Sequence, residues 1–181
     1  MKRDEAYSMV KEHVKNRNLV YHMLACEAIM RALAKHFRED EEMWGMAGLL
    51  HDLDYPETVE NPSKHGLITI EMLKDKGVDK KIMDAILAHC GKKTPETLME
   101  KALYAVDPMS GLIVASALIT PAKKLSAIDG KFVKRRFKEK AFAKGASREQ
   151  IKTCESFGVP LDEFLDIGVR AMQSIADEIG L

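Results

Sequence analysis

Hydrophobic residues return every three to four positions along most of the chain, which is the period of an amphipathic α-helix. Ile82, Ala85, Ile86 and His89 show this spacing clearly and form one face of a segment that opens at Asp79. No segment alternates apolar and polar residues with the period of a strand. The pattern predicts helices over residues 4–14, 19–37, 40–52, 63–76, 79–90, 96–106, 107–119, 147–157 and 160–179.

Residues at the ends of these segments support the boundaries. Helix N-caps are predicted at Asn18, Asp40, Ser63, Asp79 and Ser147, whose side chains can accept a bond from a free backbone N–H. Asp107 followed by Pro108 is interpreted as an N-cap and a first helical residue, so one helix is expected to end at 106 and another to begin there. Residues 55–63 contain two prolines and are expected to form a loop.

These elements predict an all-α fold built as a helical bundle. A chain of 181 residues can bury about 70% of its unfolded surface, which is enough to enclose a polar site. We expect one domain over residues 1–181, with a core that carries the site at about 19–120 and a helical extension at about 121–181.

Charge and composition limit the classes of protein to which the chain can belong. Lys and Arg number 28, and Asp and Glu also number 28, so the basic excess typical of proteins that bind nucleic acid or anionic membranes is absent. Lys123 to Lys140 is the one basic concentration and is interpreted as a solvated face. No leader and no membrane span is expected, and three scattered cysteines are typical of a reducing compartment, so we expect a cytoplasmic protein.

The candidate chemistry lies in histidines and carboxylates on the apolar faces or at helix ends. His51 and Asp52 are adjacent at the end of a helix, and His22, His65, His89 and Asp107 stand at comparable positions. A buried imidazole without a partner is costly, and one shared metal would satisfy several of them. Nitrogen mixed with carboxylate oxygen suits Mn, Fe, Co, Ni or Zn better than Ca.

The order His22, His51-Asp52, His65, His89, Asp107 resembles the HD-domain superfamily of metal-dependent phosphohydrolases, including an HDIG-like neighbourhood. The resemblance spans residues 20–112 and implies an all-helical fold. It implies that His22, His51, Asp52 and Asp107 bind one divalent ion, and that His65 and His89 bind a second with Asp52 bridging the two. Asp54 replaces the glycine of HDIG, and Cys90 follows His89 where relatives often have another histidine.

The resemblance also implies a catalytic role for His51 and Asp52 in holding two ions per chain, drawn from Mn, Fe, Co, Ni, Zn or Mg. The expected reaction is hydrolysis of a small phosphoester, a nucleotide above all, by a metal-activated water. The phosphate oxygens that the metals do not engage need further cations. Lys92, Lys123 and Lys124 are the candidates. The alternative is a catalytically silent, metal-bound regulatory or nucleic-acid-binding module. Asp54 and Glu57 could orient a ligand, but as loop carboxylates they are interpreted as solvated.

Overall fold

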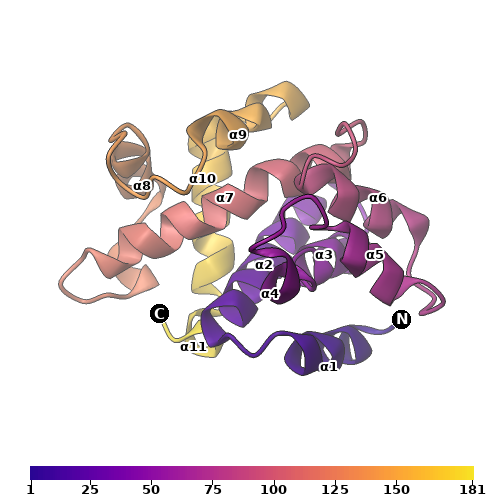
Figure 1. Ribbon diagram of the computed structural model, residues 1–181. Helices are drawn as coiled ribbons and strands as arrows, with labels where there is room; N and C mark the ends of the chain where they lie inside the picture. The colour runs from indigo at the N-terminus through magenta and orange to yellow at the C-terminus, as the bar shows by residue number, and fades with distance from the viewer.

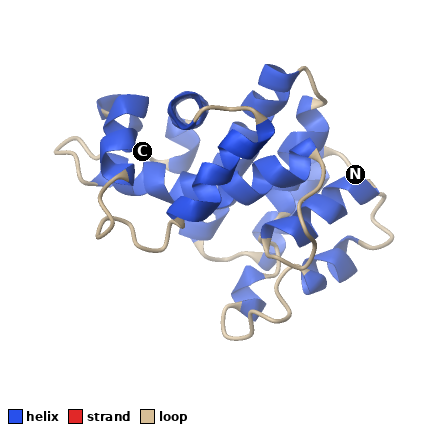
Figure 2. Cartoon of the chain, turned by 90° about the horizontal axis from the view of Figure 1, so that it is seen from above, coloured by secondary structure: helices blue, strands red, loops and turns tan.

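Helix α2 (Arg17–Phe37) is one of the two longest helices and packs against helices from both halves of the chain. The computed structural model describes residues 1–181 and contains helices and loops only (Figures 1 and 2). The remaining helices of the first two thirds of the chain are α1 (Arg3–His13), α3 (Glu41–Leu50), α4 (Tyr55–Thr58), α5 (Leu67–Leu73), α6 (Lys80–His89) and α7 (Leu98–Leu118). The last third contains η1 (Leu125–Ala127), α8 (Gly130–Phe137), α9 (Arg148–Lys152), η2 (Thr153–Phe157), α10 (Leu161–Gln173) and α11 (Ala176–Ile179).

The core lies where α2 meets α3, α7 and α10. The long α7 crosses the molecule diagonally and separates α3 to α6 from α8 and α9, while α10 runs behind it (Figure 1). A continuous cluster of 43 buried hydrophobic residues includes Leu33 of α2, Ile113 of α7 and Phe164 of α10. The all-α prediction is therefore confirmed. The division into a site-bearing core and an extension within one domain stays a prediction.

Helix caps explain where several helices begin. The side chains of Asp40, Asp79 and Ser147 accept backbone N–H bonds at the starts of α3, α6 and α9, as predicted. For α2 the prediction was two residues late, because Asn16 rather than Asn18 is the N-cap, and its side chain accepts the N–H of Asn18.

The predicted break at Asp107-Pro108 was wrong, because α7 continues through Pro108 to Leu118. Proline lacks the N–H that would bond the carbonyl four residues earlier, which normally disfavours a helix interior. Here that carbonyl, on Tyr104, accepts a bond of 2.9 Å from the Gln150 side chain. A residue 46 positions away thus supplies the missing donor, which the local sequence could not reveal.

The helix predicted over 63–76 is shorter than expected. Gly66 has φ +80, outside the right-handed helical region, so α5 starts at Leu67 and ends at Leu73. Ser63 donates to the Asn61 side chain instead of capping a helix, and His65 lies in the turn before α5. The predicted 55–63 loop contains the single turn α4, with Pro56 near its start.

Near the C-terminus the predicted helices are each divided. The 147–157 helix becomes α9 followed by η2, and the 160–179 helix ends at Gln173 before α11. Gln173 donates to the carbonyls of Leu125 and Ile128, which ties this point of α10 to η1. None of the helices combines the length and the hydropathy needed to cross a membrane.

Candidate metal centre

A close approach of α2 and α3 brings the first two histidines together. A Cβ atom at Gly48 would lie 2.7 Å from the backbone of Cys26, so only glycine allows α3 to pass this close to α2. His22 lies on α2 one turn before Cys26, and His51 follows the end of α3. Their Nε2 atoms are 3.1 Å apart as a result.

Two carboxylates complete this first group. Asp107 on α7 places Oδ1 3.2 Å from His22 Nε2 and 3.9 Å from His51 Nε2. Asp52 places Oδ2 3.5 Å from each of the same two nitrogens. Two imidazoles and two carboxylates therefore converge on one point, from α2, the turn after α3, and α7.

A second close approach brings His65 to His89. Gly66, whose left-handed φ favours glycine, would place a Cβ 2.5 Å from the Cys90 sulfur at the end of α6. The turn before α5 therefore lies directly on the end of α6. His65 Nε2 and His89 Nε2 are 3.2 Å apart there.

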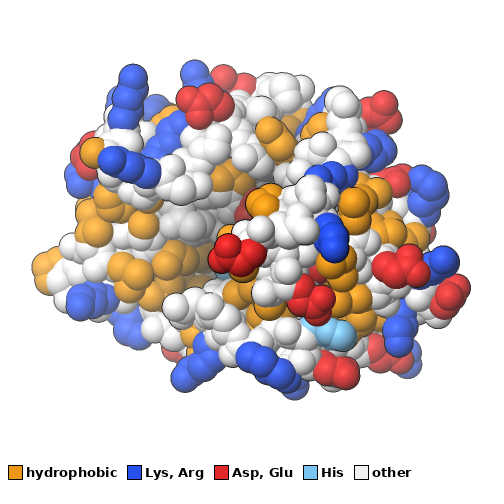
Figure 3. All heavy atoms as spheres, in the orientation of Figure 1, with side chains coloured by type: hydrophobic (Ala, Val, Ile, Leu, Met, Phe, Trp, Pro, Cys, Tyr) orange, Lys and Arg blue, Asp and Glu red, His pale blue; other side chains and the backbone are white.

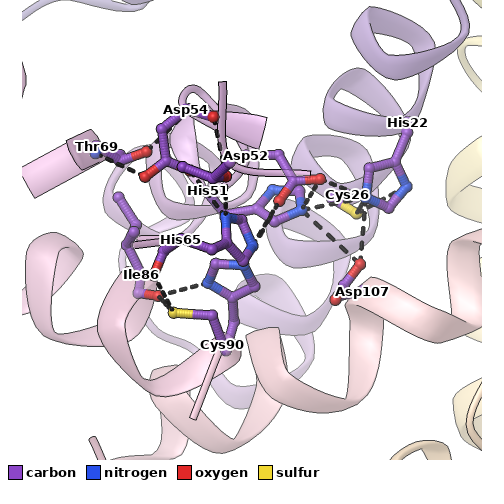
Figure 4. Close-up of polar contacts among 12 residues, drawn as sticks. His22, Cys26, His51, Asp52, Asp54, His65, Thr69, Ile86, Cys90 and Asp107 are labelled. Atoms are coloured by element: carbon purple, nitrogen blue, oxygen red, sulfur yellow. Dashed lines mark hydrogen bonds and ion pairs between the residues drawn. The ribbon is translucent and has the colours of Figure 1, made fainter. Parts of the chain in front are cut away.

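Asp52 belongs to both groups. Its Oδ2 faces His22 and His51, while its Oδ1 lies 3.3 Å from His65 Nε2 and 3.5 Å from His89 Nε2. Figure 4 shows Asp52 between the His22 side and the His65 side of the cluster. The structure thus brings together all six residues that the sequence singled out, and divides them into two groups that share one carboxylate.

The second nitrogen of each imidazole ring, Nδ1, has a hydrogen-bond partner that fixes the tautomer of the ring. His51 Nδ1 donates to the Gly48 carbonyl at 2.8 Å, and His89 Nδ1 donates to the Ile86 carbonyl. His22 Nδ1 donates at 2.8 Å to Ser110 Oγ, whose own hydrogen is used on the Asp107 carbonyl. With Nδ1 fixed as the donor, each Nε2 atom would present its lone pair to a bound metal, as second-sphere partners arrange in metal sites.

The partner of His65 is Asp54, and this corrects the sequence interpretation of Asp54 as solvated. Asp54 is fully buried, and its carboxylate accepts His65 Nδ1–H at 2.8 Å and the Thr69 backbone N–H at 2.9 Å. The Thr58 hydroxyl also lies beside it. Glu57, the other carboxylate considered, is exposed. Sequence reasoning also missed Ser110, because the supposed break at Pro108 hid its position one turn after Asp107.

The pKa values of the metal-free centre differ from ring to ring: burial acts to lower the pKa of His22, but Cys26 and the Asp107 carboxylate outweigh it and raise that pKa well above its usual value. Burial lowers the pKa of His51 to about 4, so this ring is neutral. Burial would raise the pKa of Asp52, but the surrounding imidazoles hold it well below its usual range. Burial also acts to lower the pKa of His65, yet the Asp52 and Asp54 carboxylates outweigh it and raise that pKa to about 9.

These observations test whether a divalent ion fits. Two imidazole lone pairs that face each other at 3.1 or 3.2 Å repel unless a proton or a cation lies between them. Neutral nitrogen with ionised carboxylate oxygen is the donor set of the borderline divalent metals. The residues therefore fit a metal in each group.

Cys26 is the one further donor near the first group. Its sulfur lies 3.9 Å from either nitrogen of His22, and the trio His22, Cys26 and His51 has the spacing of a metal site. Burial raises the pKa of this thiol, whereas metals bind the thiolate. The ionised Asp107 carboxylate is closer to His22 and is the better donor.

None of the three lysines predicted to hold phosphate makes a hydrogen bond or an ion pair with the six ligands. Lys92 is exposed after Gly91, beyond the end of α6. Lys123 and Lys124 follow the end of α7 at Leu118, about 16 Å beyond Asp107 at the helical rise of about 1.5 Å per residue. Lys124 Nζ donates to the Gly180 carbonyl at 3.5 Å.

Comparisons with known proteins agree with this geometry. The family model described as the HD domain matches residues 19–129, which contain all six residues of the centre. No solved structure matches the chain.

Several curated relatives carry the name Ribonuclease Y. The protein from Desulforudis audaxviator is 30% identical over 170 residues, covering 90% of this chain and 32% of the relative. Those from Nitratidesulfovibrio vulgaris strain DP4 and Sulfurovum sp. are 31% and 26% identical, over 53% and 74% of this chain and 18% and 27% of the relatives. The chain thus spans about a third or less of the length of these relatives. Because the family model covers well over half of its residues, the chain belongs to the HD-domain family.

Proposed function

We propose that the protein is a metal-dependent phosphohydrolase that cleaves a phosphoester bond of a nucleotide with water. The observation that carries the proposal is the shared carboxylate of Asp52, with one oxygen facing His22 and His51 and the other facing His65 and His89. Membership of the HD-domain family and similarity to hydrolases support the same reaction class.

In this proposal His22, His51, Asp52 and Asp107 hold a first divalent ion, and His65, His89 and Asp52 hold a second. His51 and Asp52 are the catalytic pair in the sense that they hold the ions at the reacting phosphate. When bound, the ions would activate water for attack on phosphorus and offset the charge of the phosphate oxygens.

The protein residues orient the donors and limit access of solvent. His51 and His89 are 0% and 4% exposed and close the rear of the centre. The side chains of His22 and Asp107 are 23% and 31% exposed, so a substrate can approach on their side. The network from Asp107 through Ser110 to His22 keeps the His22 ring in one orientation.

In this proposal the three lysines contact the phosphate oxygens whose charge the metal ions do not offset. Lys92 follows the ligand His89 by three residues and has no carboxylate partner, whereas Lys93 beside it is engaged by Glu96 and Glu100. Lys123 and Lys124 can serve only groups bound beyond the end of α7. Steady-state kinetics of Lys92→Ala and of the double change Lys123→Ala, Lys124→Ala test these contacts, and we expect KM to rise more than kcat falls.

A second candidate substrate is the phosphodiester bond of RNA. The balanced charge of the chain argues against a nucleic-acid partner, but the name Ribonuclease Y of the relatives favours one. The same centre could serve either substrate, because a water activated by metal attacks monoesters and diesters alike. We also place the protein in the cytoplasm, on the basis of its three free cysteines.

The experiment is a hydrolysis screen of protein purified without a chelator or a His-tag. Nucleoside monophosphates, bis(p-nitrophenyl) phosphate and a short oligoribonucleotide are offered with Mn, Co, Ni or Mg. We expect turnover that EDTA abolishes and that Asp52→Asn lacks. Bound metal without turnover on any substrate would instead favour the catalytically silent regulatory module. Retention on RNA after EDTA treatment would favour a nucleic-acid-binding module.

A further inference from the structure

A groove begins at the exposed edge of the metal centre. Of the six ligand residues, His22 is the one that lines it. Its volume is about 570 Å³, within the range of about 300–1,000 Å³ that small-molecule sites occupy. The first turns of α2 form one wall and the second half of α7 forms the other, with residues 179–181 at the far end. In Figure 3 hydrophobic side chains gather over this half of α7, on the left of the view.

Helical spacing makes the groove continuous with the centre. Gly111, Val114 and Leu118 follow Asp107 at intervals of three and four residues, so they extend the face of α7 that carries the ligand. On α2, Tyr21 directly precedes His22, and Arg17 lies one turn before Tyr21. A molecule whose phosphate lies at the centre would therefore continue into this groove.

The lining has a definite chemistry. The Tyr21 ring is half-buried, and its hydroxyl accepts a bond of 2.7 Å from the Arg17 guanidinium. The opposite wall is aliphatic, from Val114 and the 46% exposed Leu118. Arg17 is the one Lys or Arg in the lining, which contains no Asp or Glu. An aromatic face, an aliphatic face and one side-chain cation suit a flat, uncharged ring attached to a phosphate.

We propose that this groove binds the nucleoside next to the hydrolysed phosphate, with the base stacked between Tyr21 and the aliphatic wall of α7. Asn18, on the same wall as Tyr21, has a side-chain amide free to meet the edge of the base. Arg17 holds the Tyr21 ring through its hydroxyl and adds positive charge. The proposal rests on the proposed function, since it names the substrate class of the same site.

The test measures binding separately from turnover. The probe is the phosphonate analogue of 2-aminopurine riboside 5′-monophosphate, in which a methylene group replaces the bridging oxygen and prevents hydrolysis. Stacking quenches its fluorescence, so the dissociation constant can be measured with protein loaded with Mg, which does not itself quench. The metal content of each variant is measured in parallel.

Two substitutions alter the groove by opposite means. Tyr21→Ala removes the stacking surface, which is expected to weaken binding about 5- to 100-fold, while Tyr21→Phe keeps the ring and should retain most of the affinity. Gly111→Leu fills the groove from α7, and we expect it to weaken binding at least about tenfold. Nothing lies within 4 Å of a Cβ atom at Gly111, and leucine is the better helix former, so this variant should fold. Lys101→Leu, on α7 but outside the groove, is the matched control.

The outcomes separate the two proposals. Weakened binding in Tyr21→Ala and Gly111→Leu, with metal content retained and Lys101→Leu unaffected, supports the groove as the nucleoside site. Binding equal to wild type in both groove variants overturns it. Hydrolysis of bis(p-nitrophenyl) phosphate by wild type without any binding of the probe overturns the groove and leaves the phosphohydrolase standing. Binding of the probe at the groove by a protein that hydrolyses nothing supports the groove and overturns the phosphohydrolase.

Discussion

Replacing Asp54 with asparagine should weaken one metal site and spare the other. The Asp54 carboxylate accepts His65 Nδ1–H at 2.8 Å and the Thr69 N–H at 2.9 Å, and both donors meet it in a fully buried position. Asparagine has the same shape but only one accepting oxygen. Its NH₂ group must then face either the Thr69 N–H, which leaves that buried donor unpaired, or His65 Nδ1, which forces the tautomer with its hydrogen on Nε2. In both cases His65 loses its charged acceptor.

The size of the effect follows from two independent estimates. A hydrogen bond to a charged group contributes about 1.5–3 kcal/mol, and loss of a second-sphere partner costs about 10- to 100-fold in metal affinity. Since a factor of ten corresponds to about 1.4 kcal/mol, the two estimates agree. We therefore expect the second ion to bind about 10- to 100-fold more weakly and the first ion within about threefold of wild type. The free energy of unfolding should also fall by about 1–3 kcal/mol, because a buried donor is left unpaired.

The assay is metal competition against a fluorescent chelator, with ions counted by mass spectrometry after gel filtration. Glu57→Gln is the matched control, because Glu57 is an exposed carboxylate on α4, three residues from Asp54. Circular dichroism of each variant shows whether the helices are intact. Equal weakening of both ions, or no weakening of either in a folded variant, would refute the role assigned to Asp54.

Three further predictions concern other parts of the structure. Asp52→Asn should lose both ions and all turnover, since each oxygen of Asp52 faces one group; full metal content by mass spectrometry would contradict this. Binding of a metal ion at the second site at pH 7 should release about one proton, because the pKa of His65 near 9 leaves that ring protonated without metal. The metal affinity of this site should rise up to tenfold per pH unit until about pH 9 and then level off. Calorimetry in buffers of different ionisation enthalpy measures the proton release. Gln150→Ala should lower the free energy of unfolding by about 1 kcal/mol, because the Tyr104 carbonyl opposite Pro108 loses its donor; urea denaturation equal to wild type would show that water replaces the bond.

The sequence by itself determined the helical class and pointed to the residues of the candidate centre. The spacing of hydrophobic residues identifies amphipathic helices, because the residues that form one face of a helix are near one another in sequence. Cap residues such as Asp40 and Asp79 also act within one turn. The family order of histidines and aspartates identified six residues that the structure brings together. Their assignment to two ions stays a prediction, as do the three lysines.

Only the tertiary structure decided the features that depend on residues distant in sequence. Pro108 remains inside a helix because Gln150 bonds the carbonyl of Tyr104, and Asp54 is an orienting group because Thr69 and His65 fold over it. The two His pairs meet because Gly48 lets α3 approach the backbone of α2, and because Gly66 leaves room for the Cys90 sulfur, at distances that a Cβ would forbid. A sequence pattern reports which face of a helix is apolar, but which side chains then meet is fixed by how the helices pack.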